Sequence, residues 1–233
     1  MIIDKNTLCD FLEKSSFKGL IDKAILDFKE GEIIAKVATA GNFKWCKCRL
    51  DIDKIKDYKP IGEIAVKDLT WLFKCAKRFK EDIKFKIEKN VLYMKETNTE
   101  FDIVLADPDY IEERPKDVDI VFPFSKTINT ELLQDIIKDG ELGKNPDISF
   151  ETINKQLIIK VDLGLNTIKR IVQIEEEIEA KTTVQHNFLK ATVCCLTSPI
   201  VTLKFGDKYP IGLVEKCGNI NSLFIIAPKV EED

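Results

Sequence analysis

The sequence lacks most of the residues on which common catalytic and metal sites are built. Its 233 residues include one histidine, His186, and its seven cysteines form no C-x-x-C pair, which argues against a structural zinc site. The motifs G-x-G-x-x-G, G-x-x-x-x-G-K-[ST], H-E-x-x-H and G-x-S-x-G are absent. We therefore expect no metal, no cofactor and no enzymatic activity. A hydrolase that uses carboxylates alone stays open as an alternative, because acidic residues are plentiful.

Long apolar runs are missing as well. No stretch approaches the roughly 20 apolar residues that a membrane helix requires, and no secretory signal is present at the start of the chain. The cysteines are odd in number and lie inside apolar periodic runs, as is typical of proteins kept in a reducing compartment. We expect a soluble, intracellular protein that does not bind membranes.

An excess of positive charge is also absent. Lysine and arginine number 36 against 40 acidic residues, so the formal net charge is −4. Binding to nucleic acid through overall charge is therefore disfavoured, although a local basic face stays possible. The distribution of charge along the chain has to decide between these cases.

The residues that are present follow a repeated order of helices and strands. Apolar periodicity predicts helices over 6–18, 66–79, 129–139 and 184–196, with alternating strands and hairpins between them. Val201, Leu203 and Phe205 repeat the spacing of Ile83, Phe85 and Ile87. The pattern predicts an α+β fold of two similar domains, over 1–106 and 123–233, joined by a charged, proline-containing connector over 107–122.

The helix over 66–79 has the clearest basic face. At about 100° per residue, Lys67, Lys74 and Arg78 fall within roughly 20° of one line, and Lys77 lies to one side. The apolar residues gather on the opposite side, and Trp71 lies near the edge of the stripe. Acidic residues concentrate in turns and in the connector, which favours a protein that contacts duplex phosphates through its helices. A solvated basic face without any partner is the alternative interpretation.

Two stretches carry a specific resemblance. "DLTWLFKCAKRFKEDIKFKIE" at 68–88 and the last 33 residues, which end in "LFIIAPKVEED", resemble the sliding clamps of the proliferating cell nuclear antigen (PCNA) family. The resemblance implies two clamp domains per subunit, each with two helices that line a central hole, in a ring that is normally a homotrimer around duplex DNA. It assigns the DNA-facing role to Lys14, Lys18, Lys67, Lys74, Lys77, Arg78, Lys80 and Lys190, with Lys138 as a further candidate.

The resemblance also implies a pocket for partner proteins. In such clamps the connector and the C-terminal strand border an apolar pocket that takes a short motif, the PIP box, from DNA polymerase, clamp loader, nuclease and ligase. The corresponding residues would be Phe43, Trp45, Ile111, Pro210, Ile225, Ala227 and Pro228. The chain departs from the pattern at Asn42, which stands where a histidine is usual, and Phe43 and Trp45 could instead be ordinary core residues.

Ring closure is expected between two edge strands of identical subunits. Clamps join head to tail through such strands, and the candidates here are 100–106, with Glu100 and Asp102, and 167–173, with Lys169 and Arg170. Their opposite charges favour assembly.

The sequence thus predicts a DNA sliding clamp, a processivity factor for DNA replication and repair without chemistry of its own, acting at DNA in the cytoplasm, nucleoid or nucleus. A heteromeric clamp paralogue of the checkpoint or viral type is the alternative.

Overall fold

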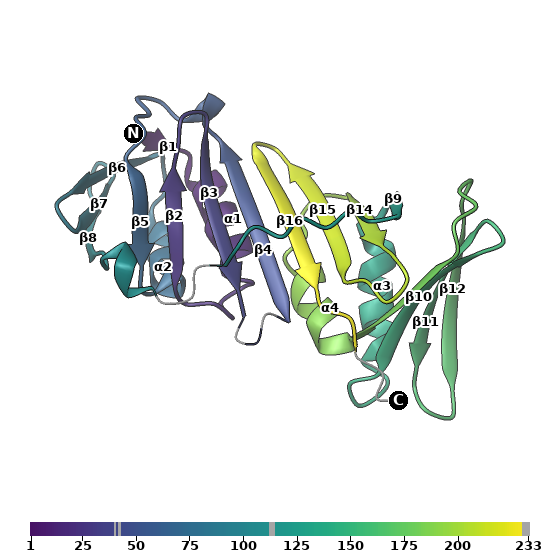
Figure 1. The fold of residues 1–233 in the computed structure, drawn as a ribbon. Coiled ribbons are helices and arrows are strands. Elements are labelled where there is room, and N and C mark those ends of the chain that lie inside the picture. Colours follow the sequence, from purple (N-terminus) through teal and green to yellow (C-terminus); the bar gives the residue numbers. More distant parts are fainter. Residues whose placement is uncertain (40, 42, 112–114, 230–233) are drawn as a thin grey trace. The chain divides into compact units, whose positions relative to one another are not determined.

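The chain forms an α+β fold with antiparallel sheets, as the sequence predicts. The computed structural model describes residues 1–39, 41, 43–111 and 115–229 (Figure 1). These residues divide between two compact units. The first is Met1–Thr39, Trp45–Lys116 and Lys216–Ser222, and the second is Ala40–Lys44, Asp117–Glu215 and Leu223–Asp233. The division at 116–117 falls inside the predicted connector, and the predicted domain limits stay a prediction.

The first unit holds two helices and two antiparallel sheets, with strand orders β5-β2-β3-β4 and β1-β6-β7-β8. Its helices pack on each other. The elements are β1 (Ile2–Ile3), α1 (Lys5–Ser15), β2 (Ala24–Phe28), β3 (Glu32–Ala38), β4 (Lys44–Asp51), β5 (Gly62–Val66), α2 (Leu69–Arg78), β6 (Ile83–Glu88), β7 (Val91–Lys95) and β8 (Glu100–Val104).

The second unit repeats this plan, with strand orders β13-β10-β11-β12 and β9-β14-β15-β16. Its two helices also pack on each other. The elements of this repeat are β9 (Phe124–Asn129), α3 (Thr130–Gly140), β10 (Asp147–Ile153), β11 (Gln156–Asp162), β12 (Thr167–Gln173), β13 (Ala180–Gln185), α4 (His186–Val193), β14 (Ile200–Phe205), β15 (Ile211–Cys217) and β16 (Ile220–Ile226). The end of β15 and the start of β16, within Lys216–Ser222, are counted with the first unit.

The internal repeat is therefore confirmed element by element. In chain order β6 corresponds to β14, which is the pair that the apolar spacing singles out, and α2 corresponds to α4. The correspondence also makes β4 the counterpart of β12 and β8 the counterpart of β16. Each sheet has the same strand order as its counterpart.

Helix α2 is shorter than the periodicity predicts. Val66 pairs with Ala24 and ends β5, so the helix starts only at Leu69, after Asp68. The Asp68 carboxylate accepts a hydrogen bond of 2.6 Å from the Trp71 backbone amide, which satisfies one of the free donors of the first turn. Lys67 and Lys80 consequently flank the helix instead of belonging to it.

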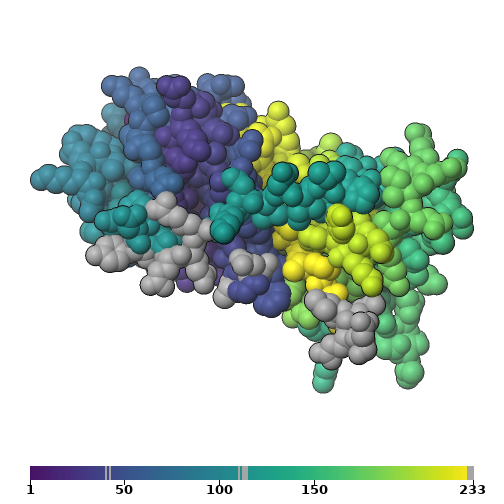
Figure 2. Space-filling model, viewed as in Figure 1, coloured from purple at the N-terminus to yellow at the C-terminus, as the bar shows by residue number. Residues whose placement is uncertain are grey.

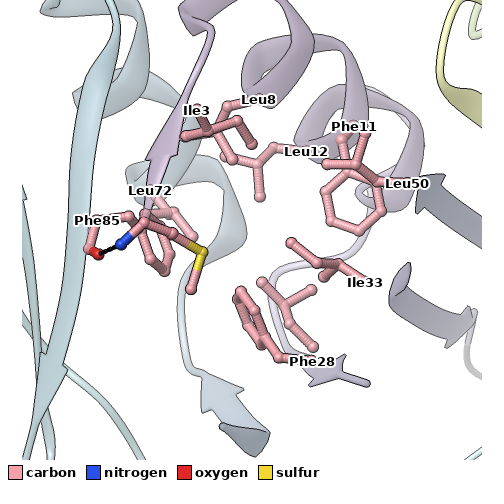
Figure 3. A pocket seen from close by; sticks show the side chains of 11 residues that line it. Ile3, Leu8, Phe11, Leu12, Phe28, Ile33, Leu50, Leu72 and Phe85 are labelled. Atoms are coloured by element: carbon pink, nitrogen blue, oxygen red, sulfur yellow. Dashed lines mark hydrogen bonds between the residues drawn. The ribbon is translucent and has the colours of Figure 1, made fainter. Parts of the chain in front are cut away.

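The core of the first unit contains a small cavity lined only by apolar side chains (Figure 3). Its volume is about 10 Å³, which is close to the minimum for one water molecule. Leu12 of α1, Leu72 of α2 and Phe28 of β2 are among the side chains that point into it (Figure 3). The apolar lining offers water no hydrogen bond, so the cavity is a packing defect.

The described part of the connector lies at the surface, where the teal residues before β9 cross the face seen in Figure 2. Val121 is 85% exposed there. Within the described ranges, no helix has the length and apolar character needed to cross a membrane.

Candidate functional site

Helix α2 exposes one continuous stripe made of cations and one tryptophan, which we call the α2 face. Lys67, Trp71, Lys74 and Arg78 follow one another at intervals of four, three and four residues, and all are exposed. Within α2 this spacing places Trp71, Lys74 and Arg78 on one side of the helix, and Lys67 is exposed just before its start. The opposite side, which includes Leu72 and Ala76, is fully buried.

The charges of the α2 face have no carboxylate partner within the described residues. No ion pair forms there at Lys67, Lys74 or Arg78. Lys77, beside the stripe, lies over the Phe73 ring at 4.5 Å from Nζ to the ring centroid. Lys80 is exposed just after the helix. These five predicted residues therefore form one accessible basic surface.

Helix α1 contributes less positive charge than the sequence predicts. Lys14 is only 1% exposed, so the expectation that it contacts phosphates is wrong. It lies one turn after Phe11, on the buried side of the helix. Lys18 is exposed, but α1 ends at Ser15 and the chain turns with positive φ at Phe17 and Lys18. The helix predicted over 6–18 therefore ends before Lys18, and Lys14 and Lys18 do not lie on one helical face.

Lys14 instead lies close to a buried thiol on β4. Burial raises the pKa of Cys48, but hydrogen bonds from neighbouring side chains and the charge of Lys14 outweigh it, so the net pKa is below its ordinary value. One of these neighbours is the Cys46 thiol, 3.4 Å away between the sulfur atoms. The charge of Lys14 thus acts inside the first unit.

In the second unit, acidic residues neutralise the helix cations. Lys190 of α4 donates a 2.6 Å hydrogen bond to Glu141, and Lys138 of α3 pairs with Asp135 at 3.0 Å. The hydrogen bond and charge of Lys190 lower the pKa of Glu141, while Glu141 raises the pKa of Lys190 in return. Both candidates are exposed, but each has its charge compensated by a neighbour.

The only histidine joins the two helices of the second unit. The His186 ring is buried, and its Nε2 donates to the Ile137 carbonyl oxygen at 2.9 Å. A Cβ atom added to Gly140 would lie 2.2 Å from the ring, so no larger residue fits there without movement. The described residues contain no cluster of three or more metal-ligating side chains.

The predicted partner pocket is divided between the units. In the second unit, Phe43 is 50% exposed and stacks on Phe188 at 5.4 Å between ring centroids. Lys44 Nζ lies over the same Phe188 ring, and the Phe43 carbonyl accepts from the Ala227 amide at 2.9 Å. Phe43 and Ala227 are thus adjacent. Pro210 and Pro228 are half-buried, and Ile225 is buried.

The other two predicted pocket residues belong to the first unit. Trp45 is 5% exposed, so it is a core residue, whereas Phe43 lies at the surface. The Trp45 indole nitrogen has no hydrogen-bond partner among the described residues. Ile111 is half-buried, and Asn42 lies outside the described residues.

The two predicted interface strands both lie at sheet edges. Strand β8 ends the order β1-β6-β7-β8, and β12 ends the order β13-β10-β11-β12. Each also exposes an apolar side chain, Val104 at 71% and Ile171 at 55%. An open edge with exposed apolar side chains is an unusual feature for a strand that stays unpaired.

The charges on these edges are only partly available. Arg170 donates to Asp139 on α3 at 2.7 Å, and Glu100 pairs with Lys95 at 2.8 Å. Arg170 and Glu100 thus each have an ion-pair partner within their own unit, and the contact of all four residues with a neighbouring subunit stays a prediction. Asp102 and Lys169 are exposed.

Comparisons with known proteins agree on the fold. No family model and no curated protein matches the sequence. Among solved structures, a complex titled "C-terminal region of FEN-1 bound to A. fulgidus PCNA" matches with a TM-score of 0.87 at 19% identity, over 100% of this chain and 99% of the other. PCNA from Thermococcus kodakaraensis matches with a TM-score of 0.83 at 17% identity, over 98% and 99%.

A third match is a chain of the PCNA2-PCNA3 complex from Sulfolobus tokodaii, with a TM-score of 0.80 at 16% identity over 99% and 100% of the two chains. All three alignments span both units and their connector. The shared architecture, including two repeats with two helices each, is therefore complete: this chain has the fold of the PCNA sliding clamps.

Proposed function

We propose that this protein is a DNA sliding clamp, a ring that encircles duplex DNA and tethers replication and repair enzymes to it. The single observation that carries the proposal is the repeat, which leaves two matching strand edges, β8 and β12, open within one chain. The clamp needs no reaction of its own. Tethering raises the local concentration of a bound enzyme at DNA.

The repeat supports a contact between copies of the chain. Within the first unit, the Lys216–Ser222 segment lies against β4, because the Asp51 amide donates to the Asn219 carbonyl at 2.9 Å. Asn219 lies in the turn just before β16 and Ser222 lies within it; the counterpart of β16 in the repeat is β8, and β4 has β12 as its counterpart. A β8 to β12 contact between neighbouring copies would therefore repeat a contact already used inside the chain. Such head-to-tail contacts generate closed rings when the rotation closes.

The α2 face supports the DNA part of the proposal. Its cations are exposed and unpaired within the described residues, so they can contact phosphates without first breaking an ion pair. Phosphate contacts of this kind attract duplex DNA without reading its sequence. A ring that slides along DNA needs such attraction to the backbone without dependence on the base sequence.

Partner binding is proposed at the surface around Phe43 and Ala227. The exposed Phe43 ring and the half-buried Ala227 and Pro228 offer an apolar wall beside the end of β16. A short motif with apolar side chains, from a polymerase, clamp loader, nuclease or ligase, could add to such a strand end. One matched structure is titled as the FEN-1 C-terminal region bound to PCNA, which supports the same kind of partner here.

The first experiment measures the mass of the purified protein by light scattering over a range of concentrations. We expect a mass of three subunits. Ile171→Glu should lower the mass, because it places a charge on the apolar part of the β12 edge. Leu165→Glu is the matched control, since Leu165 is fully exposed in the turn before β12. Arg170 is a poorer probe, because its substitution also breaks the ion pair with Asp139.

Encirclement is then tested on linear duplex DNA. A ring should remain on a duplex blocked at both ends and be lost from one with free ends, as read by the protein that co-migrates with DNA. Equal loss from both duplexes, or a protein that remains monomeric at all concentrations, would contradict the homomeric clamp. The second outcome favours a heteromeric clamp subunit, an alternative supported by the match to a complex of two different PCNA chains.

A further inference from the structure

The α2 face contains a feature that contact with duplex phosphates does not use. Trp71 is 54% exposed in the middle of the stripe, with Lys67 before it and Lys74 and Arg78 after it. At a rise of 1.5 Å per residue, Lys74 and Arg78 lie about 4.5 Å and about 10.5 Å further along the helix axis. Two cations thus follow the indole on the same side of the helix, and Lys67 is exposed just before the helix starts.

The backbone that carries the exposed indole is fixed by two hydrogen bonds. The Trp71 backbone amide donates to Asp68 at 2.6 Å, which fixes the first turn of α2. The neighbouring Thr70 hydroxyl hydrogen-bonds to Asp22 at 3.2 Å, which ties the same turn to the chain before β2. The carboxylates of Asp68 and Asp22 thus accept hydrogen bonds from the first turn of the helix. Trp71 therefore sits on a rigid turn, and its ring is available to a ligand.

The chemistry of this group of residues favours a particular form of nucleic acid. In duplex DNA the flat faces of the bases are stacked on one another, and only the backbone and the base edges are accessible from outside. An exposed indole gains little from such a surface. In a single strand the base faces are free, and aromatic side chains beside a positively charged track stack on them with little dependence on sequence.

We propose that the α2 face binds single-stranded DNA, with an unpaired base stacked on Trp71 and adjacent phosphates on Lys74 and Arg78. The inference rests on the proposed function, because the same face has to meet DNA, and it extends that function to DNA whose strands have separated. A clamp with this platform holds unpaired nucleotides at a junction between double and single strands.

The protein is well suited to a direct test, because its two tryptophans have opposite environments. Trp45 is buried, whereas Trp71 is exposed. Addition of a homothymidine oligonucleotide to the full chain should quench the fluorescence of Trp71. In Trp71→Phe only the buried Trp45 remains, so the quenching should disappear although the oligonucleotide still binds.

Affinity is measured by anisotropy of a labelled oligonucleotide and of a labelled blunt duplex. Trp71→Ala should weaken binding of the single strand by about tenfold or more, since stacking contributes on that order per base, and leave duplex binding unchanged. Trp71→Phe should retain most of the single-strand affinity because it keeps an aromatic face. Leu142→Ala, at another exposed apolar side chain, is the control that should change neither affinity.

Other outcomes overturn the inference and separate it from the proposed function. If Trp71→Ala weakens the binding of both forms of DNA equally, or of neither, the stacking role is wrong. If the wild-type protein binds duplex DNA and Lys74→Glu abolishes that binding, the proposed function stands even when the stacking role of Trp71 is wrong. If wild type binds neither form of DNA, the proposed function itself fails.

Discussion

The two units share one plan but differ in how their helices present charge. Helix α2 and helix α4 hold the same place in the repeat, and both carry cations on an exposed side. On α2, Lys74 and Arg78 are unpaired within the described residues, whereas on α4 the Lys190 ammonium lies 2.6 Å from Glu141. A count of lysines on a helix therefore does not give the charge that the helix offers to a ligand.

The acids of the second unit come from outside α4. Glu141 follows α3 in the chain, and Asp135 and Asp139 lie on α3 itself, one turn apart. Exposed ion pairs of this kind contribute only about 0–1 kcal/mol to stability. Their larger consequence is electrostatic, because each paired lysine contributes less positive potential at the surface. The positive charge of α2 is thus less compensated than that of α3 and α4.

The largest expected effect is a loss of folding stability, and it compares the packing inside the core of each unit. Leu12→Ala in α1 should destabilise the protein by about 2–5 kcal/mol, near the upper end, because the new space adds to the cavity that Leu12 already lines. Leu133→Ala removes an equally buried leucine from α3 and is the matched comparison. Chemical denaturation measures both. A smaller loss for Leu12→Ala than for Leu133→Ala would contradict the role given to the cavity.

The next effect tests the difference in available charge. Lys74→Gln with Arg78→Gln should lower the slope of log affinity against log salt for duplex DNA by about 2, as expected when two phosphate contacts are lost. Lys138→Gln with Lys190→Gln changes the net charge by the same amount but removes cations that are already paired. We expect little change in slope for this control. Equal changes in the two double variants would mean that only net charge matters.

The smallest expected effect concerns the acid titration of Glu141. The pKa of Glu141 is lowered by Lys190, so the pair contributes stability above the ordinary carboxyl pKa and loses it as pH falls through the lowered value. Lys190→Gln should raise the pKa of Glu141 toward its ordinary range, as followed by NMR of the side-chain carboxyl carbon. Lys74→Gln removes an unpaired cation and should leave Glu141 unchanged. A Glu141 titration that does not respond to Lys190→Gln would show that the pair does not persist in solution.

Much of the architecture could be predicted from local pattern. Apolar residues at helical spacing marked all four helices, and alternation marked β6, β7, β10 and β11, because one face of each element is buried. The predicted ends of the helices were less accurate. The helix predicted from residue 66 starts only at Leu69, because Val66 pairs with Ala24 as the last residue of β5.

The candidate site was predictable only where it lies on one element. The side of α2 that Lys74 and Arg78 share follows from the 3.6-residue period, so their spacing was sufficient to identify it, whereas Lys67 lies before the helix. Spacing could not reveal that Lys14 is buried or that Glu141 approaches Lys190 from another helix. One signal was overlooked: Glu131, Asp135 and Asp139 recur every four residues, which already indicated an acidic side on α3.

The sequence by itself determined the class of elements, their repeated order and the basic stripe of α2, because each depends on residues within one or two helical turns or along one strand. Tertiary structure decided which charges remain available, since an ion pair such as Arg170 with Asp139 joins residues that lie 31 positions apart. It also decided that Trp45 is core and Phe43 surface, although they stand two residues apart. Burial depends on what packs against each side chain, and that partner comes from elsewhere in the chain.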